Sequence, residues 1–179
     1  MPPVGFLNPN SVLEEWDIRP GEKIADFGCG PGFFSIPLGQ KVGQNGKIYS
    51  FDIRPEALEA TRGKAKLFHL FNIEPTRADL EVPRGSGLKD WGVDKILISN
   101  ILFQVEDQNA VIAEASRILR PGGSLLVIEW NENDAAHPIP SSKVNKEEIK
   151  SAFSGVGFGF QKEFAAGSHH YGLLFTKKD

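Results

Sequence analysis

The stretch Lys23-Ile24-Ala25-Asp26-Phe27-Gly28-Cys29-Gly30-Pro31-Gly32-Phe33-Phe34 decides the fold of this chain. A short apolar run ends in an acid, three glycines alternate with other residues, and a second apolar run follows. This order predicts a strand, a tight loop and a helix. Glycine accepts positive φ angles and has no Cβ, so a ligand can lie directly against the loop backbone. Because the loop opens a helix, whose first N–H groups are free, we expect a nucleotide-like ligand at this point.

The acid and the glycine spacing narrow the kind of ligand. Asp26 lies at the mouth of the loop, where a carboxylate would repel the pyrophosphate that dinucleotide sites hold there. The spacing is Gly-x-Gly-x-Gly and differs from the Gly-x-Gly-x-x-Gly of those sites. S-adenosylmethionine carries an adenosine, a sulfonium and an ammonium but no phosphate, so it fits both observations. A glycine loop alone is a weak signal, and the alternative is a tight turn that binds nothing.

The composition is that of a globular domain. The chain has 179 residues, of which 40% are hydrophobic and 24% charged, and its formal net charge is −3. We expect one domain over residues 1–179, with residues 1–20 as an N-terminal arm and short helix on the rim of the site. The single cysteine, Cys29, excludes a disulfide framework and a multi-cysteine metal site. A signal-peptide pattern and an 18-residue apolar run are both missing, so we expect a cytoplasmic protein without membrane contact.

Strand and helix patterns alternate along the chain, which predicts an α/β sheet. Strands are expected over 23–27, 47–52, 73–77, 93–100, 124–130, 158–164 and 171–176. Helices are expected from Asn10 or Ser11 to Trp16, over 33–42 and 55–70, from 107 or 108 to the Arg120-Pro121-Gly122-Gly123 turn, and from Asn145 onward. Ligands bind outside the carboxyl ends of parallel strands. The polar residues at those ends are Asp26, Asp52, Asp79, Ser99, Asn100 and Glu129.

Two of these positions carry further information. Asp52 lies 20 residues beyond Gly32, the spacing at which an acid reaches an adenosine ribose in a βαβ unit. The alternative role of Asp52 is to cap the helix that starts at Pro55. Pro75 cannot donate a ladder hydrogen bond, so the strand over 73–77 is expected at the edge of the sheet.

Four stretches together resemble the class I S-adenosylmethionine-dependent methyltransferases. Each one is unspecific, but their order and spacing agree with the family over about residues 20–177. The stretches are Ala25-Asp26-Phe27-Gly28-Cys29-Gly30-Pro31-Gly32, Asp52, Ala78-Asp79-Leu80 and Leu119-Arg120-Pro121-Gly122-Gly123-Ser124-Leu125. The subgroup that looks most similar contains small relatives of the C-methyltransferases of ubiquinone and menaquinone biosynthesis.

The resemblance implies a fold and a set of binding roles. The fold would be a Rossmann-like three-layer sandwich, with a mostly parallel seven-stranded sheet in the order 3-2-1-4-5-7-6 and strand 7 antiparallel. The edge position of Pro75 and a terminal hairpin agree with this order. The resemblance implies that the backbone of Gly28, Cys29, Gly30 and Gly32 would hold the methionine part of the ligand and that Asp52 would bind the ribose. Ile53, Asp79 and Leu80 would contact the adenine, and Asn100 would lie near the methionine end.

The acceptor side of the site is less defined. The loop between the last two strands would lie on the substrate rim, so we expect His169, His170 or Tyr171 to contact the substrate, with histidine suited to take up a proton near neutral pH. The alternative is a solvated turn with Tyr171 packed in its strand. His137 is interpreted as a loop residue, and no spacing of ligands supports a metal site. Gln104 is expected in the pocket wall, and Phe103 in the wall or the core.

The function predicted from these observations is methyl transfer from S-adenosylmethionine to an unidentified acceptor, in the first place a small molecule. Nucleic acid and protein acceptors stay open. One alternative is a non-catalytic module that binds S-adenosylmethionine. Another is an NAD-dependent oxidoreductase, disfavoured because neither Tyr49 nor Tyr171 begins a Tyr-x-x-x-Lys motif. The short 131–144 loop and short arm leave the pocket either shallow or completed by another chain, so a homodimer is possible.

Overall fold

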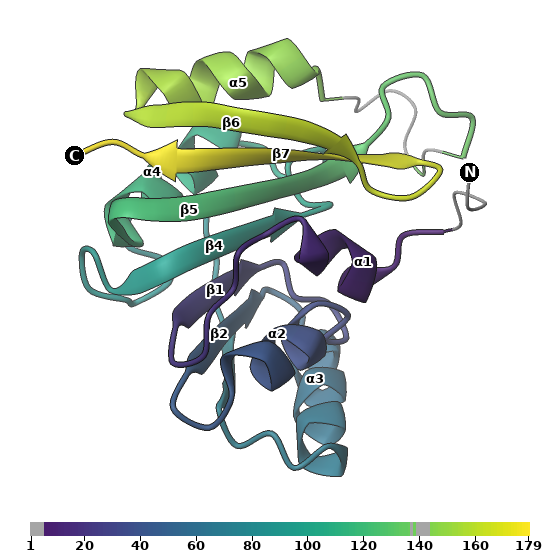
Figure 1. The fold of residues 1–179 in the computed structure, drawn as a ribbon, viewed down its shortest axis with the longest axis vertical. Helices are drawn as coiled ribbons and strands as arrows, with labels where there is room; N and C mark the ends of the chain where they lie inside the picture. The colour runs from purple at the N-terminus through teal and green to yellow at the C-terminus, as the bar shows by residue number, and fades with distance from the viewer. Residues whose placement is uncertain (1–5, 137, 139–143) are drawn as a thin grey trace.

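The computed structural model describes residues 6–136, 138 and 144–179, and these residues contain one seven-stranded sheet (Figure 1). Its strand order is β3-β2-β1-β4-β5-β7-β6, which confirms the predicted order. The strands are β1 (Lys23–Phe27), β2 (Lys47–Asp52), β3 (Ile73–Arg77), β4 (Val93–Ser99), β5 (Leu119–Trp130), β6 (Phe158–Ala165) and β7 (His170–Lys177). The N-terminal part of the expected arm and His137 lie outside the described residues.

The strands of the sheet pair mostly in parallel. β1, β2, β3, β4 and β5 pair in parallel, whereas β7 is antiparallel to both β5 and β6. The central strand β4 is buried almost throughout, as expected for a parallel strand covered on both faces. β3, which contains Pro75, is the edge strand next to β2. All five parallel strands therefore end at one edge of the sheet.

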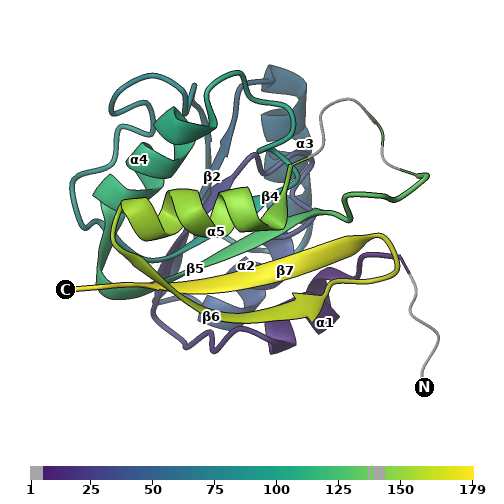
Figure 2. The ribbon, with the colours of Figure 1, turned by 90° about the horizontal axis from the view of Figure 1, so that it is seen from above.

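Helices cover both faces of the sheet (Figures 1 and 2). The helices are α1 (Pro9–Glu14), α2 (Ser35–Val42), α3 (Pro55–Leu67), α4 (Gln108–Ile118) and α5 (Lys146–Gly155). One hydrophobic cluster joins the sheet to α1, α2 and α3, and includes Leu13, Leu38 and Ala65. A second cluster joins it to α4 and α5, and includes Ala115 and Phe153. The predicted three-layer sandwich is confirmed.

Several element ends differ from the expected positions. Asn8, and neither Asn10 nor Ser11, caps α1, because its Oδ1 accepts hydrogen bonds from the N–H groups of both residues. α2 begins at Ser35 and α3 ends at Leu67, and β5 already begins at Leu119, just before the expected turn. The early start of β5 results from pairing of Leu119 with Val93, followed by a shift in register. Within the part of the chain described, no helix combines the length and apolarity needed to span a bilayer.

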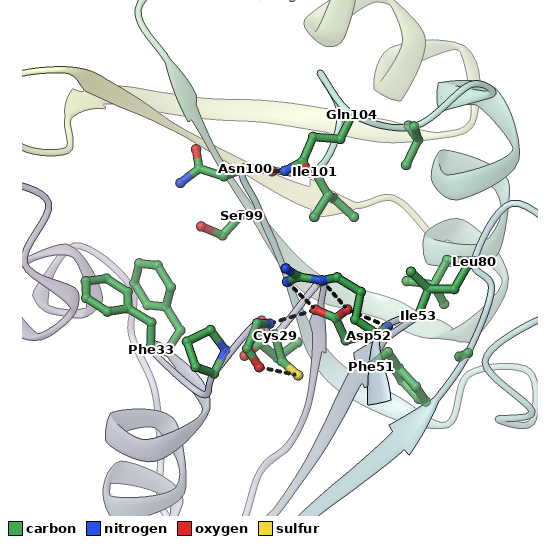
Figure 3. A pocket seen from close by; sticks show the side chains of 18 of the residues that line it. Cys29, Phe33, Phe51, Asp52, Ile53, Leu80, Ser99, Asn100, Ile101 and Gln104 are labelled. Carbon is green, nitrogen blue, oxygen red and sulfur yellow. Dashed lines mark hydrogen bonds and ion pairs between the residues drawn. The ribbon is translucent and has the colours of Figure 1, made fainter. Parts of the chain in front are cut away.

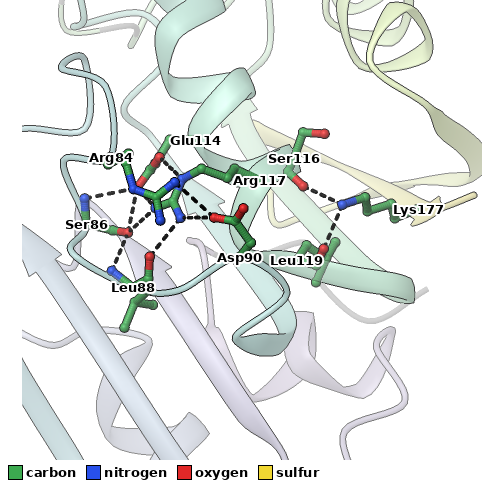
Figure 4. A network of polar contacts seen from close by, with 9 residues as sticks. All are labelled: Arg84, Ser86, Leu88, Asp90, Glu114, Ser116, Arg117, Leu119 and Lys177. Carbon is green, nitrogen blue, oxygen red and sulfur yellow. Dashed lines mark hydrogen bonds and ion pairs between the residues drawn. The ribbon is translucent and has the colours of Figure 1, made fainter.

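A polar network fastens the loop before β4 to α4 (Figure 4). The buried Glu114 accepts hydrogen bonds from the N–H and Oγ of Ser86, at 3.0 and 2.5 Å, and from both ends of the Arg117 guanidinium. Arg117 also contacts Asp90, with 2.7 Å between Nη1 and Oδ1. On the other side of α4, the Lys177 amine donates to the carbonyl of Leu119 at 2.8 Å. Residues 81–92 lack regular secondary structure. The side-chain contacts of this network hold them against α4.

Candidate active site

A cavity of about 560 Å³ opens at the carboxyl ends of β1, β2, β3 and β4 (Figure 3). Segments that are far apart in the sequence meet there, because parallel strands bring their ends to one edge. The predicted ligand-binding residues that line this cavity are Asp26, Gly28, Cys29, Gly30, Asp52, Ile53, Asp79, Leu80 and Asn100. Its volume falls within the range of small-molecule sites in proteins.

The glycine loop after β1 needs its glycines for two different reasons. Gly28, Gly30 and Gly32 all have positive φ angles, of 72, 52 and 84°. A Cβ on Gly28 would lie 2.0 Å from Cγ2 of Ile101, so this glycine lets the loop and the segment after β4 approach closely. A Cβ on Gly32 would lie 3.1 Å from Oγ1 of Thr61. Gly32 therefore packs the start of α2 against α3 and lies outside the cavity wall.

Asp26 places a buried carboxylate at the bottom of the cavity. The residue is 1% exposed, and its Oδ2 accepts a hydrogen bond of 2.6 Å from the Ser35 hydroxyl. Burial raises the pKa of Asp26 to about 7, although the hydrogen bond from Ser35 opposes this rise. A cationic group in the cavity would favour the ionised carboxylate, whereas an anionic group would be repelled by it.

Asp52 lies beside the glycine loop and binds several donors. Its Oδ2 accepts the N–H of Gly30 at 2.9 Å, and its Oδ1 accepts the N–H of Arg54 at 2.9 Å. The Arg54 guanidinium adds an ion pair, with 3.2 Å between Nε and Oδ1. Burial raises the pKa of Asp52, but the hydrogen bonds from Arg54 and Gly30 outweigh burial and hold the pKa below its usual value. Asp52 is therefore an ionised acceptor in the cavity.

Part of the cavity wall is apolar. Ile53 is 54% exposed at the mouth, while Leu80 and Phe51 form buried walls. Asp79 also lines the cavity, and its Oδ1 accepts the N–H of Glu81 at 3.0 Å. An apolar slot with one acceptor suits a planar, uncharged ring that carries an amino group.

The segment after β4 is positioned by a carboxyl group behind the cavity. Asn100 has a φ of 55°, donates its N–H to the carbonyl of Ile128 and lines the cavity. Leu102 donates its N–H to Oε1 of Glu129 at 2.9 Å, and Glu129 is 1% exposed. Gln104 lines the cavity as predicted, whereas Phe103 packs in the core.

The pH dependence of stability is expected to report on Glu129. Burial raises the pKa of Glu129 to about 8, whereas an unfolded glutamate ionises near pH 4.5. Between these values the folded state keeps a proton that the unfolded state loses, so stability falls as pH rises, by at most about 1.4 kcal/mol per pH unit. Glu129→Gln keeps the acceptor for Leu102 but cannot ionise. We expect its thermal midpoint to exceed that of the wild type at pH 8.5 and to match it at pH 5; identical profiles would contradict this.

The structure places the three predicted acceptor-side residues in different surroundings. Tyr171 is 2% exposed, and its hydroxyl donates to a backbone carbonyl. His170 is 6% exposed, with its ring 4.2 Å from that of Trp130. The side chain of His169 is 31% exposed, and its Nδ1 lies 2.8 Å from Oδ2 of Asp134. All three lie outside the cavity wall that the described residues form.

Several residues of the cavity wall could not be predicted from the sequence. Leu7, Phe33, Ile101 and Val105 contribute apolar side chains to this wall. Their single apolar side chains carry no motif, so nothing in the sequence distinguished them from the core. Arg54 also lines the cavity. Its position two residues after Asp52 was a usable signal, because a guanidinium at that spacing can reach the carboxylate.

A comparison with known families supports the interpretation of this site. A family model described as a methyltransferase domain matches residues 18–172. The chain belongs to the methyltransferase domain family. At the level of the family, the predicted S-adenosylmethionine-dependent methyltransferase is confirmed. The methyltransferase domain also matches, with a TM-score of 0.85, a solved structure described as a SAM-dependent methyltransferase from Aquifex aeolicus, at 23% identity and covering 96% of this chain and 90% of that one.

Curated relatives of the methyltransferase domain are longer than this chain. It is 29% identical over 164 residues to the demethylmenaquinone methyltransferase of Staphylococcus saprophyticus, covering 91% of this chain and 65% of that protein. It is 30% identical over 135 residues to an uncharacterized transposon protein of Streptomyces fradiae, covering 75% of this chain and 38% of that protein. The chain thus spans less than two thirds of the length of these relatives.

Proposed function

We propose that this methyltransferase domain transfers a methyl group from S-adenosylmethionine to a small acceptor. The observation that carries the proposal is the cavity that holds both Asp26 and Asp52. The two carboxylates end adjacent parallel strands and flank a glycine loop that opens α2. This donor and acceptor set fits a ligand with a cationic end and a ribose, and it does not fit a pyrophosphate.

Each part of the ligand has a matching group in the cavity wall. The backbone of Gly28, Cys29 and Gly30 would hold the methionine part, and Asp26 would face its ammonium. Asp52 would accept hydrogen bonds from the ribose hydroxyls.

The remaining residues would bind the ends of the ligand. Ile53 and Leu80 would enclose the adenine, and Asp79 would accept a hydrogen bond from its amino group. Asn100 would lie at the methionine end, next to the acceptor.

The chemistry is a displacement at the methyl carbon. The bond from carbon to the acceptor atom forms while the bond from carbon to sulfur breaks, and the electron pair of that bond stays on sulfur. Because the sulfonium is already a good leaving group, the chain contributes mainly by aligning the reactants, which is worth up to about 7–11 kcal/mol. An acceptor that carries a proton must also lose it, for which a basic side chain is suited.

Among the predicted acceptor-side residues, His169 fits the role of proton acceptor best. Tyr171 and His170 are buried, whereas His169 is half-buried and oriented by Asp134. The carbonyl of His169 accepts the N–H of Asn131 just after β5, the strand next to β4. Unchanged turnover of His169→Ala on an acceptor found by screening would remove this role.

The apolar part of the cavity wall favours an acceptor with an apolar body. Leu7, Phe33, Ile101 and Val105 lie there. The demethylmenaquinone methyltransferase relative is named for an acceptor of this character. We therefore favour an apolar ring compound over a nucleic acid, in agreement with the net charge of −3. A homodimer remains a prediction.

Ligand binding tests the proposal directly. Isothermal titration calorimetry with S-adenosylmethionine and S-adenosylhomocysteine is expected to show one site per chain, and NAD is expected to produce no heat of binding. Release of S-adenosylhomocysteine in the presence of an acceptor then separates an enzyme from a module that only binds. Binding of NAD, or failure to bind both adenosyl compounds, would overturn the proposed function.

A further inference from the structure

The carboxylate of Asp52 already has a full set of hydrogen-bond donors (Figure 3). Oδ1 accepts the N–H of Arg54 at 2.9 Å and its Nε at 3.2 Å. Oδ2 accepts the N–H of Gly30 at 2.9 Å and Nη2 of Arg54 at 3.3 Å. An ionised carboxylate offers about four lone-pair sites, so these four donors occupy them all. A ribose that donates two hydroxyl groups to Asp52 needs two of these sites to be vacated.

Only two of the four donors can leave without disturbing the fold. The N–H groups of Gly30 and Arg54 are fixed by the glycine loop and by the start of α3. The guanidinium belongs to a long side chain that is 59% exposed, and it can rotate into solvent. Its two N–H groups contact both carboxylate oxygens as a fork, as the two hydroxyl groups of a ribose would. The guanidinium and the ribose therefore require the same two acceptors.

We propose that Arg54 is an internal competitor for the ribose-binding carboxylate and thereby sets the affinity of the site for its adenosyl ligand. The inference rests on the proposed function, because it requires a ribose at Asp52. Ligand binding includes the release of the Arg54 side chain from Asp52. Since half-exposed ion pairs are weak, this release costs a limited part of the affinity. Removing the guanidinium is expected to tighten binding about three- to tenfold.

A second effect of Arg54 has to be separated from this competition. S-adenosylmethionine carries a net positive charge, so a guanidinium in the cavity also repels it electrostatically. S-adenosylhomocysteine has the same ribose but no sulfonium charge. Competition for Asp52 therefore weakens both ligands alike, whereas repulsion between charges weakens S-adenosylmethionine alone.

Calorimetric titration of both ligands into the wild type, Arg54→Ala and Arg62→Ala tests the proposal. Arg62→Ala removes the same charge as Arg54→Ala. Arg62 lies on α3, but it contacts Glu59 and the carbonyl of Pro75 outside the cavity. We expect Arg54→Ala to bind both ligands about three- to tenfold more tightly, and Arg62→Ala to match the wild type. Raising the salt concentration, which screens an exposed ion pair, should bring the affinity of the wild type for S-adenosylhomocysteine closer to that of Arg54→Ala.

The possible outcomes distinguish this proposal from the proposed function. Unchanged or weaker binding by Arg54→Ala, or a gain restricted to S-adenosylmethionine, overturns the competition while the wild type still binds. Absence of binding by every variant overturns both proposals. Arg54→Gln, which keeps the length of the side chain but loses the charged fork, is expected to give an intermediate affinity, and this guards against a local distortion in the alanine variant.

Discussion

Asp52→Ala is expected to weaken the binding of S-adenosylmethionine by about 100-fold or more. Two hydroxyl groups of the ribose would lose their charged acceptor, and hydrogen bonds to charged groups contribute about 1.5–3 kcal/mol each. Because every 1.4 kcal/mol corresponds to a factor of about ten in the dissociation constant, the loss exceeds two such factors. The N–H of Gly30 loses its acceptor as well, which loosens the loop that would hold the methionine part. Calorimetry measures the change.

Two variants make this result interpretable. Asp52→Asn keeps one oxygen acceptor, so we expect a smaller loss, of about tenfold. Asp17→Ala removes an exposed carboxylate that pairs with Arg19 away from the cavity, and it should bind like the wild type. Circular dichroism of each variant checks that the fold is retained. Wild-type affinity in Asp52→Ala would show that this carboxylate does not hold the ribose, and the assignment of the cavity would then be wrong.

Glu114→Ala is expected to lower the free energy of unfolding by about 3 kcal/mol or more. Loss of one partner from a buried ion pair typically costs about 3–5 kcal/mol, because the other charge stays behind without compensation. In this network Arg117 would lose its principal partner and both donors of Ser86 would lose their acceptor (Figure 4). For a domain of this length, such a loss lowers the thermal midpoint by roughly 6–12 °C.

An exposed ion pair serves as the control for Glu114. Glu59→Ala removes the partner of Arg62 at the same i, i+3 spacing, but the Glu59 side chain is 72% exposed. We expect it to change stability by less than about 1 kcal/mol. Differential scanning calorimetry compares the two variants. A similar, small effect of both would mean that the network around Glu114 is as weak as a surface pair.

The fold could be predicted nearly to the residue wherever the local pattern was distinctive. β1, β2 and β3 have the expected bounds. Helix ends were less accurate. The cap of α1 shifted to Asn8, since several residues there could accept the same backbone N–H groups. The start of β5 depended on Leu119 finding Val93, which no local pattern reveals.

Local chemistry along the chain was thus enough to place Asp26, Asp52 and Asp79 at one edge of an α/β sheet, whereas the strand order followed from the resemblance to the methyltransferases. What it left open were contacts between side chains that are distant in the sequence. The pairing of His169 with Asp134 spans 35 residues, and that of Glu114 with Ser86 spans 28. The physical reason is that periodicity and propensity describe each segment against an average surrounding, whereas an ion pair or a cavity wall depends on which side chains the packed layers bring within about 3 Å of one another.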